Sequence, residues 1–267
     1  MFRLGKDVKI HPTAEIKVDN GYIGDRSIIR ANAVIEGRDI RIGAEAVICE
    51  YAVIGGGSRY ESTSSLVAGD FFHMGRFSIL NQGFGIKAGH EFGCGVESKV
   101  YTHGAYLSEW NGFPSSHGPV RIGDRVWLPY AQVNPGVKIG NDVVVMAMSL
   151  VNKDLPSGCM AGGIPCKILK ENAYPRVLNA KEKGDLFRQI FKEASRIYAD
   201  RYGRSRSIPK CSRIDEDVFS LPKTTFDIRR RKIEGNVTQF SEVLKDQMRR
   251  HGIRFRYKAE GGQYVPW

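Results

Sequence analysis

Residues 99–153 decide the fold of this 267-residue chain. They read KVYTHGAYLSEWNGFPSSHGPVRIGDRVWLPYAQVNPGVKIGNDVVVMAMSLVNK. In the second half of this stretch an aliphatic side chain returns about every sixth position, at Ile122, Leu128, Ile139, Val145 and Val151. A six-residue period fits neither an amphipathic helix nor an alternating strand. It is typical of a parallel β-helix, in which each six-residue unit forms one flat side of a coil.

The same period runs through the residues before this stretch. Its members are Ile10, Ile16, Ile23, Ile29, Ile35, Ile42, Ile48, Ile54, Met74, Leu80, Ile86 and Phe92. A Gly- and Ser-rich segment, residues 55–65, interrupts it and is predicted to be a loop. Leu128 and Ile139 are eleven rather than twelve residues apart, so we expect one corner there to be tightened. Residues 1–170 are therefore predicted to form one domain of stacked coils, with a further loop at about residues 102–119.

Residues 171–267 follow a different pattern and are predicted to form a separate, mostly α-helical extension. Apolar side chains recur at helical spacing from Leu186 to Tyr198, which indicates an amphipathic helix. Thr238 is a candidate N-cap for a second helix that ends near Arg250. Alternation over residues 253–258 predicts a short strand, whereas residues 203–225 look irregular.

The charge of the chain is uneven. The net charge is +11, and residues 171–267 hold 22 Lys and Arg against 13 Asp and Glu, a net charge of +9. This basic extension is either a solvated surface or a surface that faces anions such as phosphates or an anionic sugar. No nucleic-acid-binding motif accompanies the charge, so we expect no nucleic-acid partner.

Cysteine spacing and hydropathy indicate the cellular compartment of the protein. The five cysteines are scattered and form no CxxC pair, which argues against a disulfide framework and a zinc knuckle. No apolar run reaches the length of a membrane span, and residues 1–12 lack the apolar core of a signal peptide. We therefore expect a cytoplasmic protein without an integral membrane segment.

Residues 118–170 resemble the ending of the hexapeptide-repeat acyltransferases, and the resemblance extends over about residues 5–170. NPGVKIG is similar to that family's LPGVxIG corner, LVNKDLP to its VVTKDVP, and AGGIPCK to its AGNPAK close. The resemblance implies an all-β, left-handed parallel β-helix that assembles as a homotrimer and binds acetyl-CoA between neighbouring subunits. It also implies a loop histidine that acts as general base on a hydroxyl or amine.

His103, in the sequence YTHG at the start of the loop, matches the position of the family's base. Histidine suits this task because its ordinary pKa lies near neutrality. His117 is the competitor and is expected rather to shape the loop or touch the acceptor. Glu109 is the nearest loop carboxylate and is a candidate to orient His103, although a solvated surface charge explains it equally simply. Tyr106 and Trp110 are candidates for an apolar wall against a sugar ring.

For the donor, the backbone near Ala147, Gly162 and Gly163 is expected to meet the pantetheine arm of CoA. Lys167 is expected to meet one of its phosphates as a point charge. Cys159 and Cys166 have no basic neighbour in sequence, so we expect them to be small apolar core residues rather than nucleophiles.

The predicted function is acetyl transfer from acetyl-CoA to a hydroxyl or amine of a sugar, in a surface polysaccharide or a related carbohydrate. Two alternatives from other classes remain. One is a non-catalytic β-helix scaffold. The other is a zinc enzyme similar to γ-type carbonic anhydrases, which the spacing of His73, His90, His103 and His117 disfavours because no HxxxxH element is present. We expect no metal.

Overall fold

The computed structural model describes residues 1–57, 60–203 and 206–266. The chain divides into two compact units, Met1–Arg176 and Val177–Trp267. Residues 58–59 of the expected loop 55–65 and residues 204–205 of the expected irregular segment lie outside the described residues.

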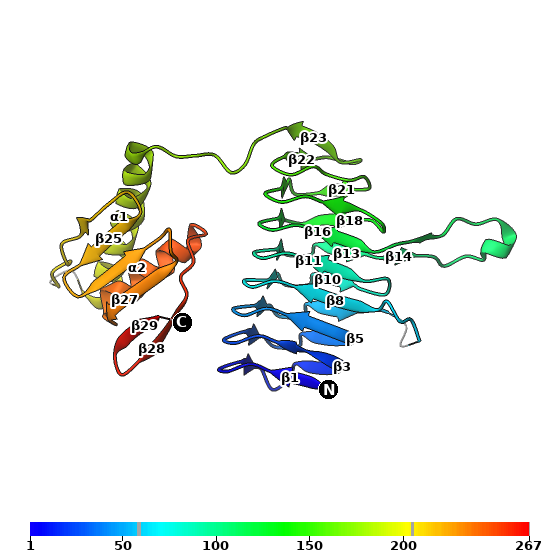
Figure 1. Cartoon of the computed structure of the whole chain (residues 1–267), viewed down its shortest axis with the longest axis horizontal. Helices are drawn as coiled ribbons and strands as arrows, with labels where there is room; N and C mark the ends of the chain where they lie inside the picture. The colour runs from blue at the N-terminus through cyan, green and yellow to red at the C-terminus, as the bar shows by residue number, and fades with distance from the viewer. Residues whose placement is uncertain (58–59, 204–205, 267) are drawn as a thin grey trace. The chain divides into compact units, whose positions relative to one another are not determined.

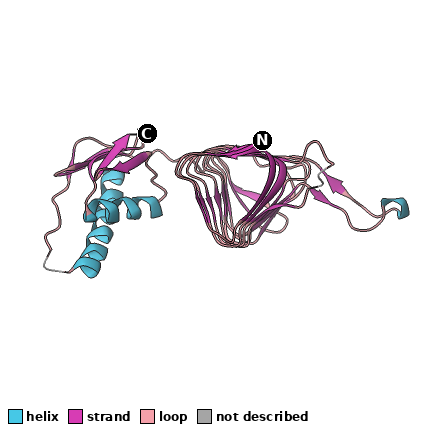
Figure 2. Ribbon diagram, turned by 90° about the horizontal axis from the view of Figure 1, so that it is seen from below, coloured by secondary structure: helices cyan, strands magenta, loops and turns pink. Residues whose placement is uncertain are grey.

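The first unit is the expected left-handed parallel β-helix, a stack of triangular coils (Figures 1 and 2). Strands from successive coils pair in parallel and in register, so each side of the triangle becomes a sheet. One sheet wraps around a corner and covers two sides, and its strands are β1 (Phe2–Leu4), β3 (Glu15–Ile23), β5 (Val34–Ile42), β7 (Val53–Gly55), β8 (Ser65–Ala68), β10 (Ile79–Asn81), β11 (Ile86–Ala88), β13 (Lys99–Tyr101), β16 (Val120–Ile122), β18 (Ala131–Val133), β19 (Lys138–Ile139) and β21 (Ser149–Val151). The other sheet contains β2 (Lys9–Ile10), β4 (Ile28–Ile29), β6 (Val47–Ile48), β9 (His73–Met74), β12 (Gly93–Cys94), β17 (Trp127–Leu128), β20 (Val144–Val145), β22 (Met160–Gly162) and β23 (Lys167–Lys170).

The six-residue period marks the core, as predicted. The periodic side chains from Ile23 to Val151 point inward and are buried. Corners between the sides are tight, and many hold a residue with positive φ, including Met148 at 55°. The final strand, β23, runs antiparallel to β22 and closes the stack.

The tightened corner expected between Leu128 and Ile139 lies at Pro129–Tyr130. In the coil below, three residues separate Cys94 from Ser98, whereas two separate Leu128 from Ala131. The buried Ser98 hydroxyl compensates for the shorter chain. It donates to the carbonyl of Leu128 at 2.5 Å and accepts from the amide of Ala131 at 3.1 Å.

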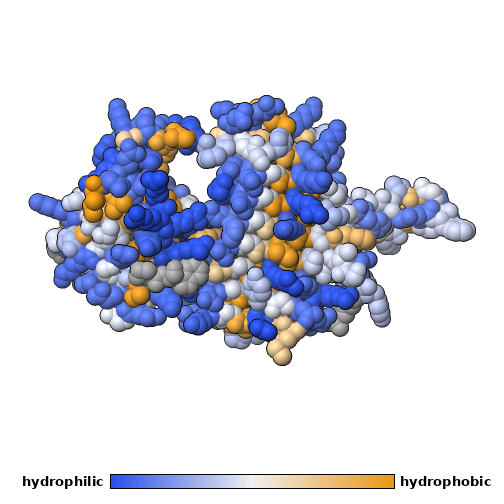
Figure 3. All heavy atoms as spheres, in the orientation of Figure 1, coloured by the Kyte–Doolittle hydropathy of each residue, from blue (hydrophilic) through white to orange (hydrophobic). Residues whose placement is uncertain are grey.

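The three sides of the β-helix carry different outward residues, because alternate residues of a strand point to opposite faces. The cationic face is formed by the whole of β1, β8, β11, β16 and β19, together with the C-terminal halves of β3 and β5. Its outward row is Arg3, Tyr22, Arg41, Val67, Lys87, Arg121 and Lys138. The apolar face is the nine-stranded sheet, and between its end lysines the outward row is Ile28, Val47, His73, Gly93, Trp127, Val144 and Met160. The third face contains β7, β10, β13, β18 and β21 and is mixed. In the view of Figure 3, hydrophilic side chains border an apolar stripe along the β-helix.

The second unit contains the helical extension that the sequence predicts. The two predicted helices are present as α1 (Ala180–Tyr202) and α2 (Gln239–Arg250), and Thr238 caps α2 as expected. Beside them lies a six-stranded antiparallel sheet, of which the sequence predicted only the short strand at residues 253–258, found here at Tyr257–Glu260. In spatial order its strands are β24 (Ser212–Arg213), β25 (Val218–Leu221), β26 (Thr224–Asp227), β27 (Lys232–Asn236), β29 (Gln263–Pro266) and β28 (Tyr257–Glu260).

This unit has its own core, in which aromatic residues of the helices meet those of the sheet. Phe187 of α1 stacks on Phe219 of β25 with ring centroids 3.5 Å apart, and Phe240 of α2 is also buried. Alternating burial along β25, in which Phe219 and Leu221 point inward, is the signal that identifies the sheet. In the described part of the chain, no helix is long and apolar enough to cross a membrane.

Candidate functional site

The candidate site begins at the corner that follows β13. Thr102 is fully buried there and links its coil to the one below. Its hydroxyl donates to the carbonyl of Asn81 at 2.8 Å and accepts from the amide of Phe84 at 2.9 Å. The amide of Gly118 donates to the Thr102 carbonyl at 2.9 Å, so the residues where the loop leaves and rejoins the coil are held together. Thr102 therefore fixes the direction in which the loop departs.

The two loop histidines form the base of the loop. Strands β14 (His103–Gly104) and β15 (Ser116–His117) pair antiparallel, and this pairing sets His103 opposite His117. The ring of Phe84 packs near both, with centroids 6.2 Å from His103 and 5.0 Å from His117. His103 is half-buried and His117 is exposed. The structure thus brings together the predicted base and its predicted competitor, in a stem that we define as residues 102–104 and 116–118.

One ring nitrogen of His103 faces the wall of the β-helix. Its Nδ1 is buried and forms no hydrogen bond with any residue that the structure describes. Gly83 lies against it, because a Cβ at Gly83 would come within 3.0 Å of Nδ1 and 3.3 Å of Cε1. Only glycine therefore leaves the imidazole its present room. Since Nδ1 faces the wall, Nε2 is the nitrogen left for an acceptor.

Glu109 and Trp110 lie away from this stem, and Tyr106 points into solvent. Glu109 begins the short 3-10 helix η1 (Glu109–Asn111), which lies at the tip of the projecting loop, whereas His103 lies at its base (Figure 1). Tyr106 and Trp110 are 98% and 96% exposed. Within the described part of the chain, Glu109 forms no hydrogen bond with His103. A single chain thus does not unite the tip, which we define as residues 106–113, with the stem, and the orienting role of Glu109 stays a prediction.

The predicted donor residues gather in the last coils. Ala147 is exposed at the corner between β20 and β21, but its neighbour Met146 lies against Gly162, where a Cβ would come within 2.9 Å of the Met146 Cβ. The amide of Gly163 already donates to the Ser149 hydroxyl at 2.9 Å. Lys167 is exposed in β23. Ala147 and Lys167 are therefore accessible, whereas Gly162 is covered by Met146 and the Gly163 amide is engaged.

These donor residues do not meet the stem within one chain. Ala147 precedes β21, whereas His103 follows β13, so the two lie at opposite edges of the third face and two strands apart. A site that used both would have to extend across that face or include a neighbouring subunit.

Three residues that hold the stem were not predicted from the sequence: Gly83, Phe84 and Thr102. The signal that identifies the first two is the coil length. Gly83 and Phe84 occupy the same corner as the stem one coil earlier, about 18 residues before it. Any residue predicted to act at a corner of a β-helix is therefore supported by the residues one coil away.

Three of the five cysteines, Cys94, Cys159 and Cys166, are packed into the core of the β-helix. Cys94 and Cys159 are fully buried in the β-helix, and burial raises the pKa of the Cys94 thiol to about 12. Burial also raises the pKa of Cys159 and Cys166. A thiol is a poor nucleophile in its protonated form, so the apolar role predicted for Cys159 and Cys166 fits their surroundings. Among the described residues, no three His, Cys, Asp or Glu side chains are grouped to hold a metal ion.

Known proteins similar to this chain are acetyltransferases. The galactoside O-acetyltransferase of Escherichia coli (strain K12) is 36% identical over 78 residues, which are 29% of this chain and 36% of that protein. YvoF of Bacillus subtilis (strain 168), whose name assigns it to the acetyltransferases, is 43% identical over 100 residues, 36% of this chain and 55% of that protein. The chain resembles the hexapeptide-repeat acetyltransferases.

The matches to these acetyltransferases are partial. The chain spans about a third to a half of the length of the curated relatives named above. Among solved structures, a point mutant of the N-acyltransferase AntD from Bacillus cereus, in complex with dTDP and coenzyme A, is 19% identical with a TM-score of 0.44. The match covers 72% of this chain and 91% of that one. No family model matches the chain.

Proposed function

We propose that the β-helix unit is an acetyl-CoA-dependent acetyltransferase whose general base is His103. The observation that carries this proposal is the stem, where Thr102, Gly83 and Phe84 hold one histidine at a corner with a single ring nitrogen free. A catalytic base must be held in a narrow range of positions, and the stem is built to hold this side chain still. The similarity to acetyltransferases supplies the reaction class.

In the proposed reaction, Nε2 of His103 accepts the proton of an acceptor hydroxyl or amine. The oxygen or nitrogen then forms a bond to the thioester carbonyl carbon of acetyl-CoA. As the tetrahedral intermediate collapses, the carbon–sulfur bond breaks, and the imidazolium returns the proton to the leaving thiolate. This role places the imidazole against the acceptor rather than against the nucleotide part of the donor.

We propose a sugar as acceptor, in line with the galactoside named for the relative from Escherichia coli. His117, beside His103 in the stem, is the proposed acceptor contact. Ala147 and Lys167 are the accessible members of the proposed donor-binding set, and Gly162 and Gly163 are its other members.

We further propose that the active protein is a homotrimer in which the loop tip reaches a neighbouring copy. Two observations support this assembly. The apolar face presents an outward row without acidic residues, with Trp127 41% exposed. Tyr106 and Trp110 at the tip are almost completely exposed in one chain, although large aromatic side chains are normally packed. Sedimentation at micromolar concentration should show three copies, and a monomer would contradict the assembly.

Acetyl-CoA consumption, measured against a panel of sugars, nucleotide sugars, serine and aminoglycosides, tests the reaction. We expect turnover with at least one sugar and calorimetric binding of CoA. The H103A variant, which we expect to keep the fold because His103 lies in the loop stem, is the matched control for background hydrolysis. If no acceptor is turned over and CoA does not bind, the proposed function is wrong.

A further inference from the structure

One face of the β-helix carries a single file of positive charge. Five of the seven residues in the outward row of the cationic face are Lys or Arg, and none is acidic. A second, shorter outward row lies beside it on β3, β5 and β8 and contains Asn20, Asp39 and Ser65. Because neighbouring strands are about 4.8 Å apart, six steps from the first to the last residue give a row about 29 Å long. The row ends at Lys138, beyond which Asp154 accepts a hydrogen bond from the Lys138 amide at 2.8 Å.

Most of these cations have no acidic partner in the described part of the chain. Among the described residues, no ion pair involves Arg3, Lys87, Arg121 or Lys138, and only Arg41 is paired, with Asp39 at 2.9 Å. The corner cations of the same unit behave differently. Arg26 pairs with Glu45 at 2.8 Å, and Arg125 pairs with Asp142 at 2.5 Å. Arg26 and Arg125 are therefore neutralised at their corners, whereas four of the five cations in the row on the cationic face have no carboxylate partner among the described residues.

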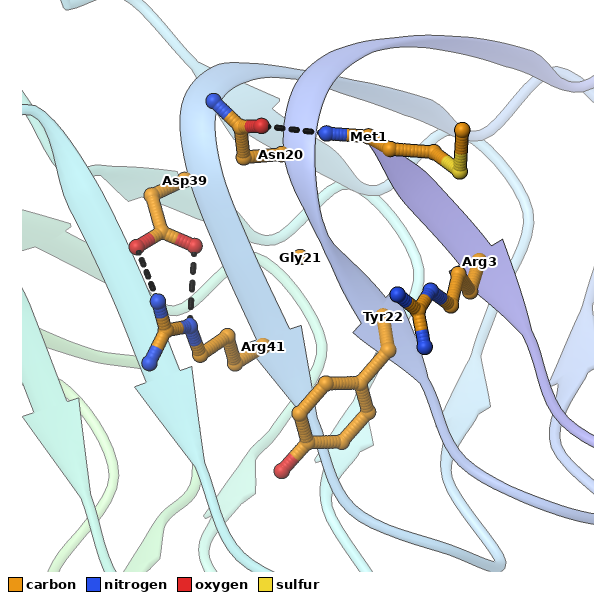
Figure 4. A pocket seen from close by; sticks show the side chains of 7 residues that line it. All are labelled: Met1, Arg3, Asn20, Gly21, Tyr22, Asp39 and Arg41. Carbon is orange, nitrogen blue, oxygen red and sulfur yellow. Dashed lines mark hydrogen bonds and ion pairs between the residues drawn. The ribbon is translucent and has the colours of Figure 1, made fainter.

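The row begins in a shallow, open depression of about 450 Å³. Figure 4 shows the Tyr22 ring between the guanidinium groups of Arg3 and Arg41, with Asp39 bound to the far side of Arg41. A half-exposed aromatic ring between two cations offers an apolar surface to the flat side of a sugar ring and positive charge to an acidic substituent. The amide side chain of Asn20, which accepts from the chain's amino terminus, lines the same depression.

We propose that the cationic face binds a linear acidic polysaccharide, which lies along the axis of the β-helix from the Tyr22 depression toward Lys138. The naming of a polysaccharide rests on the proposed function, in which the acceptor is a sugar. From β11 to β19 each strand presents one outward side chain, Lys87, Arg121 or Lys138, so this part of the face suits a single extended chain that carries repeated anionic groups. A single-stranded nucleic acid fits less well, because its recognition relies on successive aromatic side chains and this row holds only one.

The test is the binding of fluorescein-labelled polygalacturonate, a linear polymer of acidic sugars, followed by anisotropy between 50 and 200 mM salt. The variant K87Q/R121Q/K138Q removes three charges from the cationic face. The matched control K6Q/K9Q/K153Q removes three exposed charges from elsewhere on the same unit. We expect the first variant to weaken binding at least tenfold and the control to weaken it less than twofold. Loss of three contacts should also reduce the slope of log K against log salt by about 2.

Two further probes distinguish an acidic polysaccharide from a neutral polysaccharide and from a nucleic acid. Neutral dextran should not bind, and single-stranded DNA of equal charge should bind more weakly than polygalacturonate. DNA that binds as tightly, an equal loss in both triple variants, or no binding by the wild-type protein would overturn the inference.

The same proteins distinguish failure of this inference from failure of the proposed function. If polygalacturonate binds with the expected variant pattern but no acceptor is acetylated, the face stands and the acetyltransferase proposal fails. If a small neutral sugar is acetylated by all three proteins but polygalacturonate does not bind, the acetyltransferase stands and the cationic face has another role.

Discussion

The stem and the tip of the projecting loop differ in how tightly the rest of the chain holds them. At the stem, a buried threonine joins two coils, a phenylalanine packs against both histidines, and a glycine leaves room for one imidazole. At the tip, two aromatic side chains and a carboxylate extend into solvent. Both regions supply residues that the sequence marks as functional, yet only one of them is built by this chain alone.

This difference separates two kinds of functional residue. A group that must hold a proton in place needs a rigid setting, and the stem supplies one. A group that meets another molecule needs reach and exposure, and the tip supplies those. We therefore expect stem substitutions to change the rate of the reaction, and tip substitutions to change assembly and binding of the acceptor.

The largest effect should come from H103A. If His103 is the general base, turnover should fall by about 10²–10⁴-fold, the usual contribution of positioned acid–base catalysis. The Michaelis constant for acetyl-CoA should hardly change, because an interaction made chiefly in the transition state does not contribute to donor binding. Steady-state kinetics with the best acceptor measure both quantities. H117A should affect acceptor affinity more than turnover, and the opposite pattern would exchange the two roles.

A smaller effect should come from G83A, which moves His103 without removing it. The added methyl group would lie 3.0 Å from Nδ1, so the imidazole must shift by a few tenths of an ångström. We expect turnover to fall about 10- to 100-fold, since small misplacements of reacting groups are costly. G104A is the matched control, because a Cβ there meets no atom within 4 Å. Equal activity of the two variants would show that the position of His103 does not limit the rate.

The stem should also matter for stability. T102V keeps the shape of the side chain but leaves the amide of Phe84 without its acceptor, which should cost about 1–3 kcal/mol. For a unit of this size that cost lowers the melting temperature by roughly 2–4 °C per kcal/mol. T63V, at an exposed hydroxyl, is the control and should leave the melting temperature unchanged within about 1 °C. A T102V protein as stable as the wild type would mean that water replaces the lost acceptor.

The sequence predicted the coils better than the site. The coils are marked by a local pattern, whereas the site depends on contacts between residues that are far apart in sequence. The six-residue period is local and repeated, so Ile122 and Val145 could be placed inward from spacing alone. The stem depends on a contact between Phe84 and the loop histidines, which the chain brings together only after closing a full coil. The helix stripe through Phe187 was visible in the second unit, but most of its sheet was missed because β24 and β25 are short and lie among polar residues.

The predicted donor-binding residues differ in whether they are exposed to solvent in a single chain. Ala147 and Lys167 are exposed, whereas Met146 lies over Gly162. Sequence similarity located this corner, where Met146 stands at a position that is often glycine in the similar acyltransferases, and the structure shows that its side chain covers Gly162. The large Met146 side chain has to move, or the donor has to approach from beyond it, before the Gly162 backbone can meet a ligand.

The smallest effect should come from E109Q, which tests the tip directly. In one chain the carboxylate lies in η1, away from His103, so it has no part in holding the imidazole. We expect turnover to fall less than about tenfold and the melting temperature to stay unchanged, because an exposed surface substitution usually alters stability by at most about 0.5 kcal/mol. W110A is the companion variant, and it should weaken the trimer without changing the melting of the β-helix.

If E109Q instead reduced turnover as much as H103A, the carboxylate would have to reach the imidazole of a neighbouring copy. Co-assembly of H103A with E109Q would then decide the matter. Mixed trimers would regain activity only if one subunit supplied the histidine and the next supplied the carboxylate. Such a result would make the tip part of the catalytic machinery and remove the division between the two ends of the loop.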